Sequence, residues 1–416
     1  MRRFALFIAL TCVSIFGFAR KFDLGKHRFR LSRTDFADTI QLVIDRQQQI
    51  LIPVKIGDQT RLFKLDTGSG FGVIYENGAV SHQTVLGDVK SVDGAGQSTS
   101  VRVVTLPPFT IGSVEISDYA VTESPSSVLS RSFRHDAVIG FALFSQGLAA
   151  KIDIAAKQLI ITDRKDFFDA EQGEAIKYEN YHYAPYVTIS PAPGVKLKTL
   201  FDTGCSDLYL LDRKDYDKNK KKLAAVTTES TRGRIGIANN GVEREDEIIF
   251  LSLGEMQWSD LRFTQIEART HQGVTSIGRA LLRYGALIIN PFNRKLIFQP
   301  YEQRETASDK NRIAVCNHLP DIYYIPKGHS VMVGLVRTSS PLYKAGLHRG
   351  DIILSVNGHT VDFHSFISYP WVKGHTYTLR VQDILGFQKE ITIEKRFAFQ
   401  RFSRGNEGCI SSIFYI

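Results

Sequence analysis

The sequence contains one pattern twice: two apolar strands joined by a turn and followed by Asp-Thr-Gly. The first copy, IPVKIGDQTRLFKLDTGSG, occupies residues 52–70, and the second, PYVTISPAPGVKLKTLFDTGCSD, occupies residues 185–207. In both copies apolar residues alternate along the strands, and Gly or Pro marks the turn between them. A repeated strand pattern of this kind predicts two copies of one β-rich lobe.

A second pair of matching segments supports the duplication. With one gap, residues 139–161 and residues 277–298 agree in Ile-Gly, a following Ala-Leu, a Gly, and two strands around a short turn. The two pairs of matches occur in the same order and at similar spacing, so we infer that one lobe was duplicated. The chain also has 43% hydrophobic residues and 32 glycines, which suits a large core and β-structure with frequent turns.

Each Asp-Thr-Gly motif places a carboxyl group directly after a repeated strand pair. Two carboxyl groups held close together cannot both ionise, so the pair can supply both the base and the acid that hydrolysis of a peptide bond requires. We therefore predict that Asp66 and Asp202 form one catalytic dyad. The glycines permit a tight turn that leaves backbone amides free for the carboxylates, and the threonines can bond the opposite lobe. These supporting residues are Thr67, Gly68, Thr203 and Gly204.

The motifs LFKLDTGSG and TLFDTGCSD, with Val-Ile-Gly at 138–140 and Ser-Ile-Gly at 276–278, resemble those of the retropepsin-like aspartic proteases. The resemblance is to the bacterial form, in which two lobes are fused in one chain and a PDZ domain follows. It implies a mostly β, pseudo-twofold, two-lobed aspartic-protease β-barrel fold followed by a small α+β PDZ-like domain. It also implies an aspartic-type endopeptidase that acts on polypeptide substrates and uses no cofactor and no metal.

Three details depart from that family pattern. Cys205 stands where the family has Ala or Ser, and both a small packing residue buried beside the dyad and a redox brake on activity stay open. Ser276 replaces an apolar residue in the second lobe. The flap that covers the substrate is only loosely marked: our candidate is the turn containing Gly94, Ala95 and Gly96, and a plain hairpin turn is the alternative.

The C-terminal part carries a second resemblance. Ser-Pro-Leu at 340–342, Lys-Ala-Gly-Leu at 344–347, Gly-Asp-Ile-Ile at 350–353 and Val-Asn-Gly at 356–358 resemble the helix-to-strand core of bacterial PDZ domains. This implies capture of an extended peptide, often a C-terminus, by strand addition. Residues 324–330 show no clear apolar, Gly-rich carboxylate-binding loop, so a structural PDZ-like domain without strong ligand affinity stays open.

The first residues are typical of a targeting signal. Arg2 and Arg3 precede an apolar run at 4–18, and Gly-Phe-Ala at 17–19 offers a cleavage site. We predict a cleaved signal peptide, export to the periplasm or the extracellular space, and no integral membrane span in the mature chain. An uncleaved anchor is the alternative.

Composition shifts along the chain predict the domain boundaries. Polar stretches separate the repeats from each other and from the PDZ-like segment. The predicted divisions are a signal peptide at 1–19, lobe 1 at 20–170, lobe 2 at 171–304, a linker at 305–325, a PDZ-like domain at 326–400 and a C-terminal tail at 401–416.

Charge argues against a nucleic-acid partner. The formal charge is +9, and loss of Arg2 and Arg3 with the signal lowers it to +7, which is mild for 416 residues. The densest basic run, at 214–222, has acids mixed in, so we expect a solvated loop or helix face. We expect a monomer whose partners are polypeptide substrates and, at the PDZ-like domain, peptide C-termini.

Three cysteines remain after removal of Cys12 with the signal. Cys316 and Cys409 flank the PDZ-like segment, and because domain termini are often close in space, a Cys316–Cys409 disulfide is one interpretation. Two ordinary free cysteines are the other.

The main functional alternative is a non-catalytic scaffold or chaperone-like peptide-binding protein. A scaffold has no need for two like charges held together, so the presence of both aspartates favours the peptidase. The sequence has no GxSxG and no HExxH motif, which argues against a serine hydrolase or a zincin.

Overall fold

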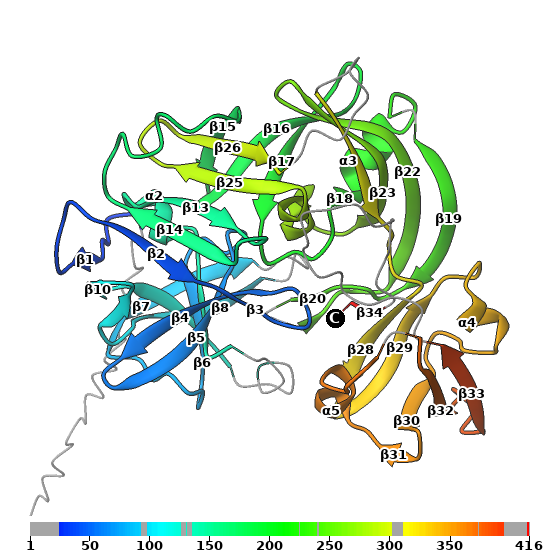
Figure 1. The fold of residues 1–416 in the computed structure, drawn as a ribbon. Helices are drawn as coiled ribbons and strands as arrows, with labels where there is room; N and C mark the ends of the chain where they lie inside the picture. The colour runs from blue at the N-terminus through cyan, green and yellow to red at the C-terminus, as the bar shows by residue number, and fades with distance from the viewer. Residues whose placement is uncertain are drawn as a thin grey trace, which may run out of the picture.

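The computed structural model describes residues 25–92, 98–125, 130, 135–223, 225–238, 241–301, 311–372, 374–394 and 414–415. Strands make up 55% of the structure and helices 8%, so the prediction of a mostly β fold is confirmed. Figure 1 shows three β-rich bodies, with lobe 1 in blue and cyan, lobe 2 mainly in green, and a C-terminal module in gold to red. The predicted signal peptide, the flap residues Gly94, Ala95 and Gly96, and Cys409 lie outside the described residues.

Lobe 1 is built on the first copy of the repeat. Its two predicted strands form an antiparallel hairpin in which Ile52 lies opposite Phe63, and both side chains are fully buried. In spatial order the sheet of lobe 1 contains β1 (Arg30–Leu31), β10 (Val114–Ser117), β9 (Phe109–Ile111), β4 (Ile50–Ile56), β5 (Gln59–Leu65), β12 (Ala137–Ile139), β6 (Gly72–Tyr75), β11 (Ala120–Ser124), β8 (Ser98–Thr105) and β7 (Thr84–Val92), with β3 (Val43–Ile44) paired to β4.

Lobe 2 repeats this arrangement with the second copy. The spatial order of its strands from β16 to β19 matches the order from β4 to β7 in lobe 1, strand for strand. These strands are β16 (Ala184–Ala192), β17 (Val195–Asp202), β24 (Ser276–Gly278), β18 (Tyr209–Asp212), β23 (Leu261–His271), β22 (Asp246–Trp258) and β19 (Val226–Gly233). The hairpin β19–β22 is therefore the counterpart of the hairpin β7–β8, and the inferred duplication is confirmed at the level of topology.

The sheet of lobe 2 continues beyond β16 into a central sheet segment that joins the two lobes. Its strands, in spatial order, are β2 (Ala37–Gln41), β14 (Gln158–Thr162), β13 (Ala149–Asp153), β25 (Gly285–Asn290), β26 (Lys295–Pro300) and β15 (Glu174–Tyr181). The strands of lobe 1 and lobe 2 mirror each other about the antiparallel pair β13–β25, in which Lys151 lies opposite Ile288. This central sheet, visible between the lobes in Figure 1, lies across the pseudo-twofold axis of the fold.

Short helices interrupt the strands. The turn α2 (Ala142–Ser145) and the 3-10 helix η1 (Arg279–Arg283) occupy equivalent places before β13 and β25, and α3 (Arg213–Asn219) covers part of the basic run. No side chain of α3 is buried, as expected for a solvated helix face. Among the helices of the described chain, none combines the length and apolarity that a membrane crossing requires.

The C-terminal module has its own sheet and core. Ser340 caps its first helix, because the Ser340 hydroxyl accepts a hydrogen bond from Leu342 N at 3.0 Å, and Gly346 then ends it with a φ of +94°. The elements are β28 (Ile322–Lys327), β29 (Ser330–Val336), α4 (Pro341–Lys344), β30 (Ile352–Val356), β31 (His359–Thr360), α5 (Phe363–Ile367), β32 (Thr376–Gln382), β33 (Gln388–Glu394) and β34 (Phe414–Tyr415). The sheet order is β33-β32-β30-β29-β28-β34.

The predicted linker at 305–325 is wrong in its second half. Within it, β27 (Arg312–Asn317) pairs in parallel with β23 of lobe 2, and β28 already begins at Ile322. The strand forms because Ile313 and Val315 alternate into the core of lobe 2, where they are 7% and 2% exposed. The polar residues just before this strand obscured that short alternation in the sequence.

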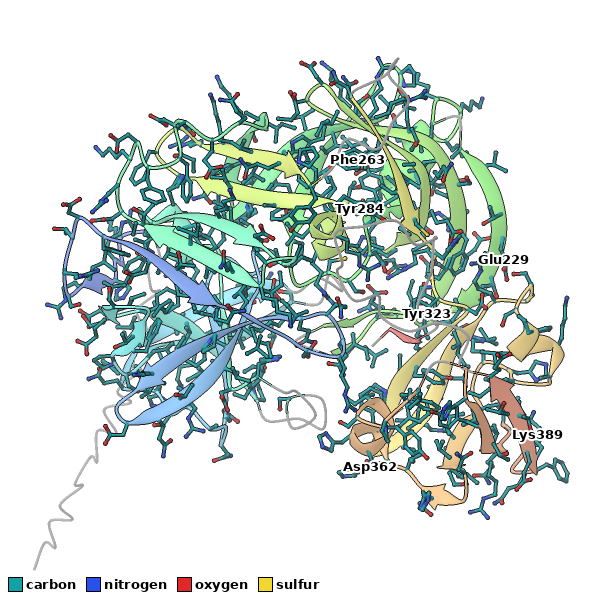
Figure 2. The ribbon with its side chains drawn as sticks, viewed as in Figure 1. Glu229, Phe263, Tyr284, Tyr323, Asp362 and Lys389 are labelled. Carbon is teal, nitrogen blue, oxygen red and sulfur yellow. The ribbon has the colours of Figure 1, made fainter. Side chains whose placement is uncertain are left out.

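The module is docked on the hairpin β19–β22 of lobe 2. Glu229 of β19 forms an ion pair with Arg337 at 3.2 Å and accepts hydrogen bonds from the hydroxyls of Thr338 (2.9 Å) and Ser339 (2.7 Å). Figure 2 shows Glu229 where lobe 2 meets the module. A backbone hydrogen bond also connects lobe 2 to the module, because Arg234 N donates to Gly334 O at 3.0 Å. An apolar cluster completes the interface and consists of Ile235, Ile248, Phe250, Leu319, Tyr323 and Leu335.

Candidate active site

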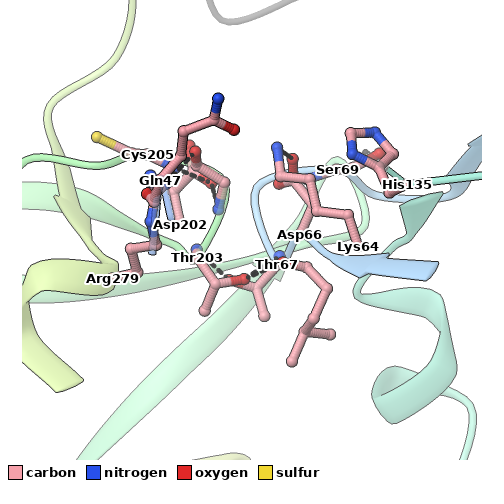
Figure 3. Close-up of polar contacts among 12 residues, drawn as sticks. Gln47, Lys64, Asp66, Thr67, Ser69, His135, Asp202, Thr203, Cys205 and Arg279 are labelled. Carbon is pink, nitrogen blue, oxygen red and sulfur yellow. Dashed lines mark hydrogen bonds and ion pairs between the residues drawn. The ribbon is translucent and has the colours of Figure 1, made fainter. Parts of the chain in front are cut away.

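The structure brings Asp66 and Asp202 together where the two lobes meet (Figure 3). Each aspartate follows a fully buried apolar residue, Leu65 at the end of β5 and Phe201 near the end of β17. Burying a side chain of this size stabilises the fold by about 1.5–3 kcal/mol, so these residues anchor the two strand ends. The two carboxyl groups lie within hydrogen-bonding distance of each other.

Reciprocal hydrogen bonds lock the two Asp-Thr-Gly loops together. Thr67 N donates to the Thr203 hydroxyl at 3.0 Å, and Thr203 N donates to the Thr67 hydroxyl at the same distance. Each hydroxyl in turn donates across the interface, Thr67 to Phe201 O at 2.8 Å and Thr203 to Leu65 O at 2.9 Å. Both threonines are buried, so the four bonds are shielded from solvent and fix the spacing of the two aspartates.

The motif glycines are required by close packing across the same interface. A Cβ atom on Gly68 would overlap the Asp202 carboxyl group, and a Cβ atom on Gly204 would overlap the Asp66 carboxyl group. Each loop therefore leaves room for the aspartate of the other lobe. The predicted support residues all lie at the dyad.

Backbone amides and one lysine contact the carboxyl groups. Asp202 Oδ1 accepts hydrogen bonds from Gly204 N at 2.8 Å and from Cys205 N at 3.2 Å. Asp66 Oδ1 accepts one from Ser69 N at 3.2 Å, and Asp66 Oδ2 forms an ion pair with Lys64 Nζ at 3.0 Å. Charge-assisted bonds of this kind hold the carboxyl planes in a fixed orientation.

The surroundings shift the pKa values of the two aspartates in opposite directions. Burial and the neighbouring charge of Asp66 raise the pKa of Asp202 to about 7. Burial alone would also raise the pKa of Asp66, but the Lys64 ammonium group and the hydrogen bonds to the carboxylate outweigh it and lower this pKa. At neutral or mildly acidic pH, one carboxyl group is thus ionised while the other holds a proton, which suits paired base and acid chemistry on a bound water.

Two of the three departures from the family pattern, Cys205 and Ser276, lie in lobe 2. Cys205 is half-buried rather than fully buried, and a Cβ atom on Gly278 would come within 3.0 Å of its sulfur. Burial raises the pKa of its thiol, aided by the charges of Asp207 and Asp202, which keeps it in the less reactive protonated form. Ser276 is 3% exposed and pairs in β24 with Leu200 of β17.

Other residues near the dyad were missed in the sequence. Arg279 donates from Nη1 to Gly204 O at 2.8 Å and from Nη2 to Gln47 O at 3.0 Å, so it ties lobe 1 to the Asp-Thr-Gly loop of lobe 2. Asp207 and Arg269 form a buried ion pair at 2.7 Å beside the same loop. Lys64 carried a signal, because it is a charged residue between the apolar Phe63 and Leu65, just before an Asp-Thr-Gly motif.

The candidate flap lies between β7 and β8 in the sequence. The two strands pair in register from Thr84 opposite Thr105 to Val92 opposite Ser98. Gly94, Ala95 and Gly96 lie outside the described residues, so the flap assignment stays a prediction.

The structure settles the bonding state of one of the two cysteines that flank the C-terminal module. Cys316 is disulfide-bonded, so the interpretation of Cys316 as a free thiol is wrong. Its predicted partner, Cys409, lies outside the described residues. Within the part of the chain that the structure describes, no group of three or more His, Cys, Asp or Glu residues could hold a metal ion.

A comparison with known families identifies one segment of the chain. The family model described as Aspartyl protease matches residues 52–143, a segment that runs from β4 into α2 and contains Asp66, Thr67 and Gly68. This segment is therefore an aspartyl protease-like domain. No curated protein sequence matches the chain.

Proposed function

We propose that the chain is an aspartic-type endopeptidase that hydrolyses peptide bonds in exported polypeptides. The observation that carries this proposal is the pair of carboxyl groups of Asp66 and Asp202, held within hydrogen-bonding distance by reciprocal threonine bonds. Two carboxyl groups of unequal acidity at one point provide a base and an acid without any further group.

In the proposed mechanism, a water molecule lies between the two carboxyl groups. The ionised carboxylate takes a proton from this water as the oxygen attacks the peptide carbonyl, and the protonated carboxyl group gives its proton to the carbonyl oxygen. The tetrahedral intermediate then collapses: the carboxyl group that took the proton of the water gives it to the nitrogen, and the C–N bond breaks. The other carboxylate takes a proton from one hydroxyl of the intermediate as the carboxyl product forms and the amine leaves. Afterwards the two aspartates again share one proton.

The test is hydrolysis of unstructured peptides by purified protein. Asp66→Asn and Asp202→Asn should each abolish cleavage, because either change removes the base or the shared proton. A peptide mimic with a tetrahedral hydroxyl group at the scissile position should inhibit the native protein. Asp58→Asn, in the exposed turn between β4 and β5, is the matched control and should keep activity.

Two results would contradict the peptidase proposal. Cleavage that persists in both Asn variants, or that is lost on addition of a chelator, would indicate different chemistry. Binding of unfolded polypeptides without cleavage, equal in the native protein and both variants, would favour the non-catalytic scaffold.

For the C-terminal module we propose a PDZ-like role in peptide recognition, on the basis of the sequence resemblance. Strand β28 contributes a sheet edge where only the two residues of β34 pair with it among the described residues, Phe414 opposite Ile322 and Tyr415 opposite Tyr323. Fluorescence anisotropy with the full chain provides the test, using one apolar peptide with a free C-terminus and the same peptide amidated. Equal or absent binding of both peptides would favour a purely structural module.

Export is proposed from the N-terminal residues alone. The charged start, the apolar run and the small-residue site at 17–19 support removal of residues 1–19. N-terminal sequencing of the protein from periplasmic or culture fractions should find Arg20 first. An intact Met1 in membrane fractions would favour an uncleaved anchor.

A further inference from the structure

Lys64 is in direct contact with one member of the dyad. Its Nζ atom lies 3.0 Å from Asp66 Oδ2, and the two side chains are 16% and 19% exposed. Lys64 and Asp66 are two positions apart at the end of β5, so both side chains emerge on the same face of the strand. Figure 3 shows Lys64 beside Asp66.

The pseudo-twofold symmetry of the fold reveals that this lysine has no counterpart in lobe 2. In lobe 1, β5 pairs in parallel with β12, and Lys64 lies opposite Val138. In lobe 2, β17 pairs in parallel with β24, and Leu200 lies opposite Ser276 in the same register. The position two residues before each aspartate is therefore Lys64 in one lobe and Leu200, 6% exposed, in the other. A lysine therefore contacts the aspartate in lobe 1 only. In lobe 2 the buried Arg279 and Arg269 contact Gly204 O and Asp207 instead of Asp202.

The other titratable groups around this pair do not supply the same charge. Asp202 faces Asp66 across the axis, Tyr75 approaches from β6, and His135 precedes β12, with its Nε2 3.1 Å from the Tyr75 hydroxyl. Burial lowers the pKa of His135 to about 3, with a further contribution from Lys64, so its imidazole is neutral at neutral pH. Burial raises the pKa of Tyr75, which keeps the phenol neutral.

One further charged pair lies along the same strands. Arg61 and Asp136 face each other at 3.9 Å, and Asp136 also accepts a hydrogen bond from Leu62 N at 2.8 Å. These contacts occupy both groups at the far side of β5 from the dyad. The ammonium group of Lys64 is thus the positive charge in contact with Asp66.

We propose that Lys64 is a positioning residue that keeps Asp66 as the ionised base and leaves the shared proton on Asp202. This inference rests on the proposed peptidase function and deepens it. In a symmetric dyad either carboxyl group can act as the base or hold the shared proton. Here the lysine makes Asp66 the base and leaves the proton on Asp202. It also extends the active range of the enzyme to more acidic pH, because a cation at 3.0 Å disfavours protonation of Asp66.

The test is the pH dependence of kcat/KM for peptide hydrolysis. Lys64→Leu copies the residue that lobe 2 has at the equivalent position, and Lys64→Gln provides a second neutral variant in case the first folds poorly. Both should move the acid limb of the profile to higher pH by about 1–3 units, since an opposite charge at this range changes a carboxyl pKa by that amount. The alkaline limb should move in the same direction, because Lys64 also lowers the pKa of Asp202.

Two further variants separate charge from packing. Lys64→Arg keeps the positive charge and should retain the native profile, whereas Lys55→Leu removes an exposed lysine on β4 and should change nothing. A uniform loss of kcat/KM at every pH in the Lys64→Leu and Lys64→Gln variants, with unmoved limbs, would overturn the proposal and indicate a structural role only.

A second readout does not depend on activity. Carbon-detected NMR titration of the aspartate side chains follows the ionisation of Asp66 directly, with Asp66→Asn and Asp202→Asn used for assignment. In Lys64→Leu, Asp66 should titrate at higher pH than in the native protein. If the native protein cleaves no peptide, the peptidase proposal fails while this titration still decides the role of Lys64. An unchanged titration overturns that role even in an active enzyme.

Discussion

Thr67 and Thr203 each donate a backbone N–H group to the side-chain hydroxyl of the other, at 3.0 Å in both directions. Because the donors and acceptors are exchanged symmetrically, the two loops can only be held in one relative position. The aspartates directly precede the threonines, so their relative position is fixed as well. The geometry of the dyad is therefore determined by residues that do not themselves contact the reacting atoms.

Replacing Thr67 by Val should weaken both the fold and the activity. The change removes the hydroxyl, so Thr203 N and Phe201 O lose their partners in a buried interface. We expect a loss of about 2–4 kcal/mol in the free energy of unfolding, measured by urea denaturation, and a fall in peptide hydrolysis. Thr67→Ser retains the hydroxyl and is the matched control. Equal stability of the Val and Ser variants would show that these bonds do not hold the loops.

A methyl group at Gly204 should displace the dyad. Its Cβ atom would overlap the Asp66 carboxyl group, so Gly204→Ala must shift one loop relative to the other. We expect kcat/KM to fall by about 100-fold, the loss that a misplacement of about 1 Å can cause. Gly254→Ala, where the added atom meets nothing within 4 Å, is the control and should keep activity. A fully active Gly204→Ala protein would argue that the two carboxyl groups need not be so close.

Asp202→Asn should stabilise the folded protein at alkaline pH while abolishing hydrolysis. Burial and the charge of Asp66 raise the pKa of Asp202 in the folded state to about 7. In the unfolded chain this pKa is about 4, so the contribution of Asp202 to stability falls as the pH rises from about 4 to about 7. The Asn variant lacks this loss, and its free energy of unfolding at pH 8 should exceed the native value by about 1–4 kcal/mol.

The pH dependence of that difference is the control. At pH 4 the native and Asp202→Asn proteins should be nearly equal in urea denaturation. Asp66→Asn should be less stable than Asp202→Asn at pH 8, because it removes the carboxylate that faces Lys64. A stability difference that is the same at pH 4 and pH 8 would show that the effect does not come from ionisation.

Glu229→Ala should loosen the C-terminal module from lobe 2. The carboxylate of Glu229 is 6% exposed and pairs with Arg337, whose side chain is 15% exposed. Removing one partner of a buried ion pair costs about 3 kcal/mol or more, so hydrogen exchange of residues 330–339 should become faster. Glu179→Ala breaks a comparable but exposed pair with Lys198 and should have little effect. Unchanged exchange in Glu229→Ala would mean that the apolar cluster alone holds the module.

Much of the fold follows from local sequence patterns. Strand alternation and turn residues predict the hairpins β4–β5 and β16–β17, and the repeat predicts that the two lobes share a topology. The same local logic places Asp66 and Asp202 at equivalent strand ends. These features depend on neighbours in the sequence, which is why they can be predicted.

Other features depend on contacts between distant segments. Strand β27 forms because lobe 2 offers it the free edge of β23, some distance away in the sequence. The contact between Lys64 and Asp66 depends on which face of β5 is turned toward the dyad. The ion pair of Asp207 with Arg269 joins the loop before β18 to β23. In these cases the sequence shows that the residues are charged, but only the folded structure shows which residues they contact.

The central sheet determines whether the two halves of the chain can separate or unfold independently. Residues 150–152 of β13 are hydrogen-bonded to residues 287–289 of β25, so the two halves of the chain share one continuous array of strands. A single nick in the exposed connection between β14 and β15 would cut the covalent link and leave both halves associated. One hydrophobic core contains residues of both halves, as in an obligate dimer whose subunits are joined by a tether, so we expect the two halves to unfold together.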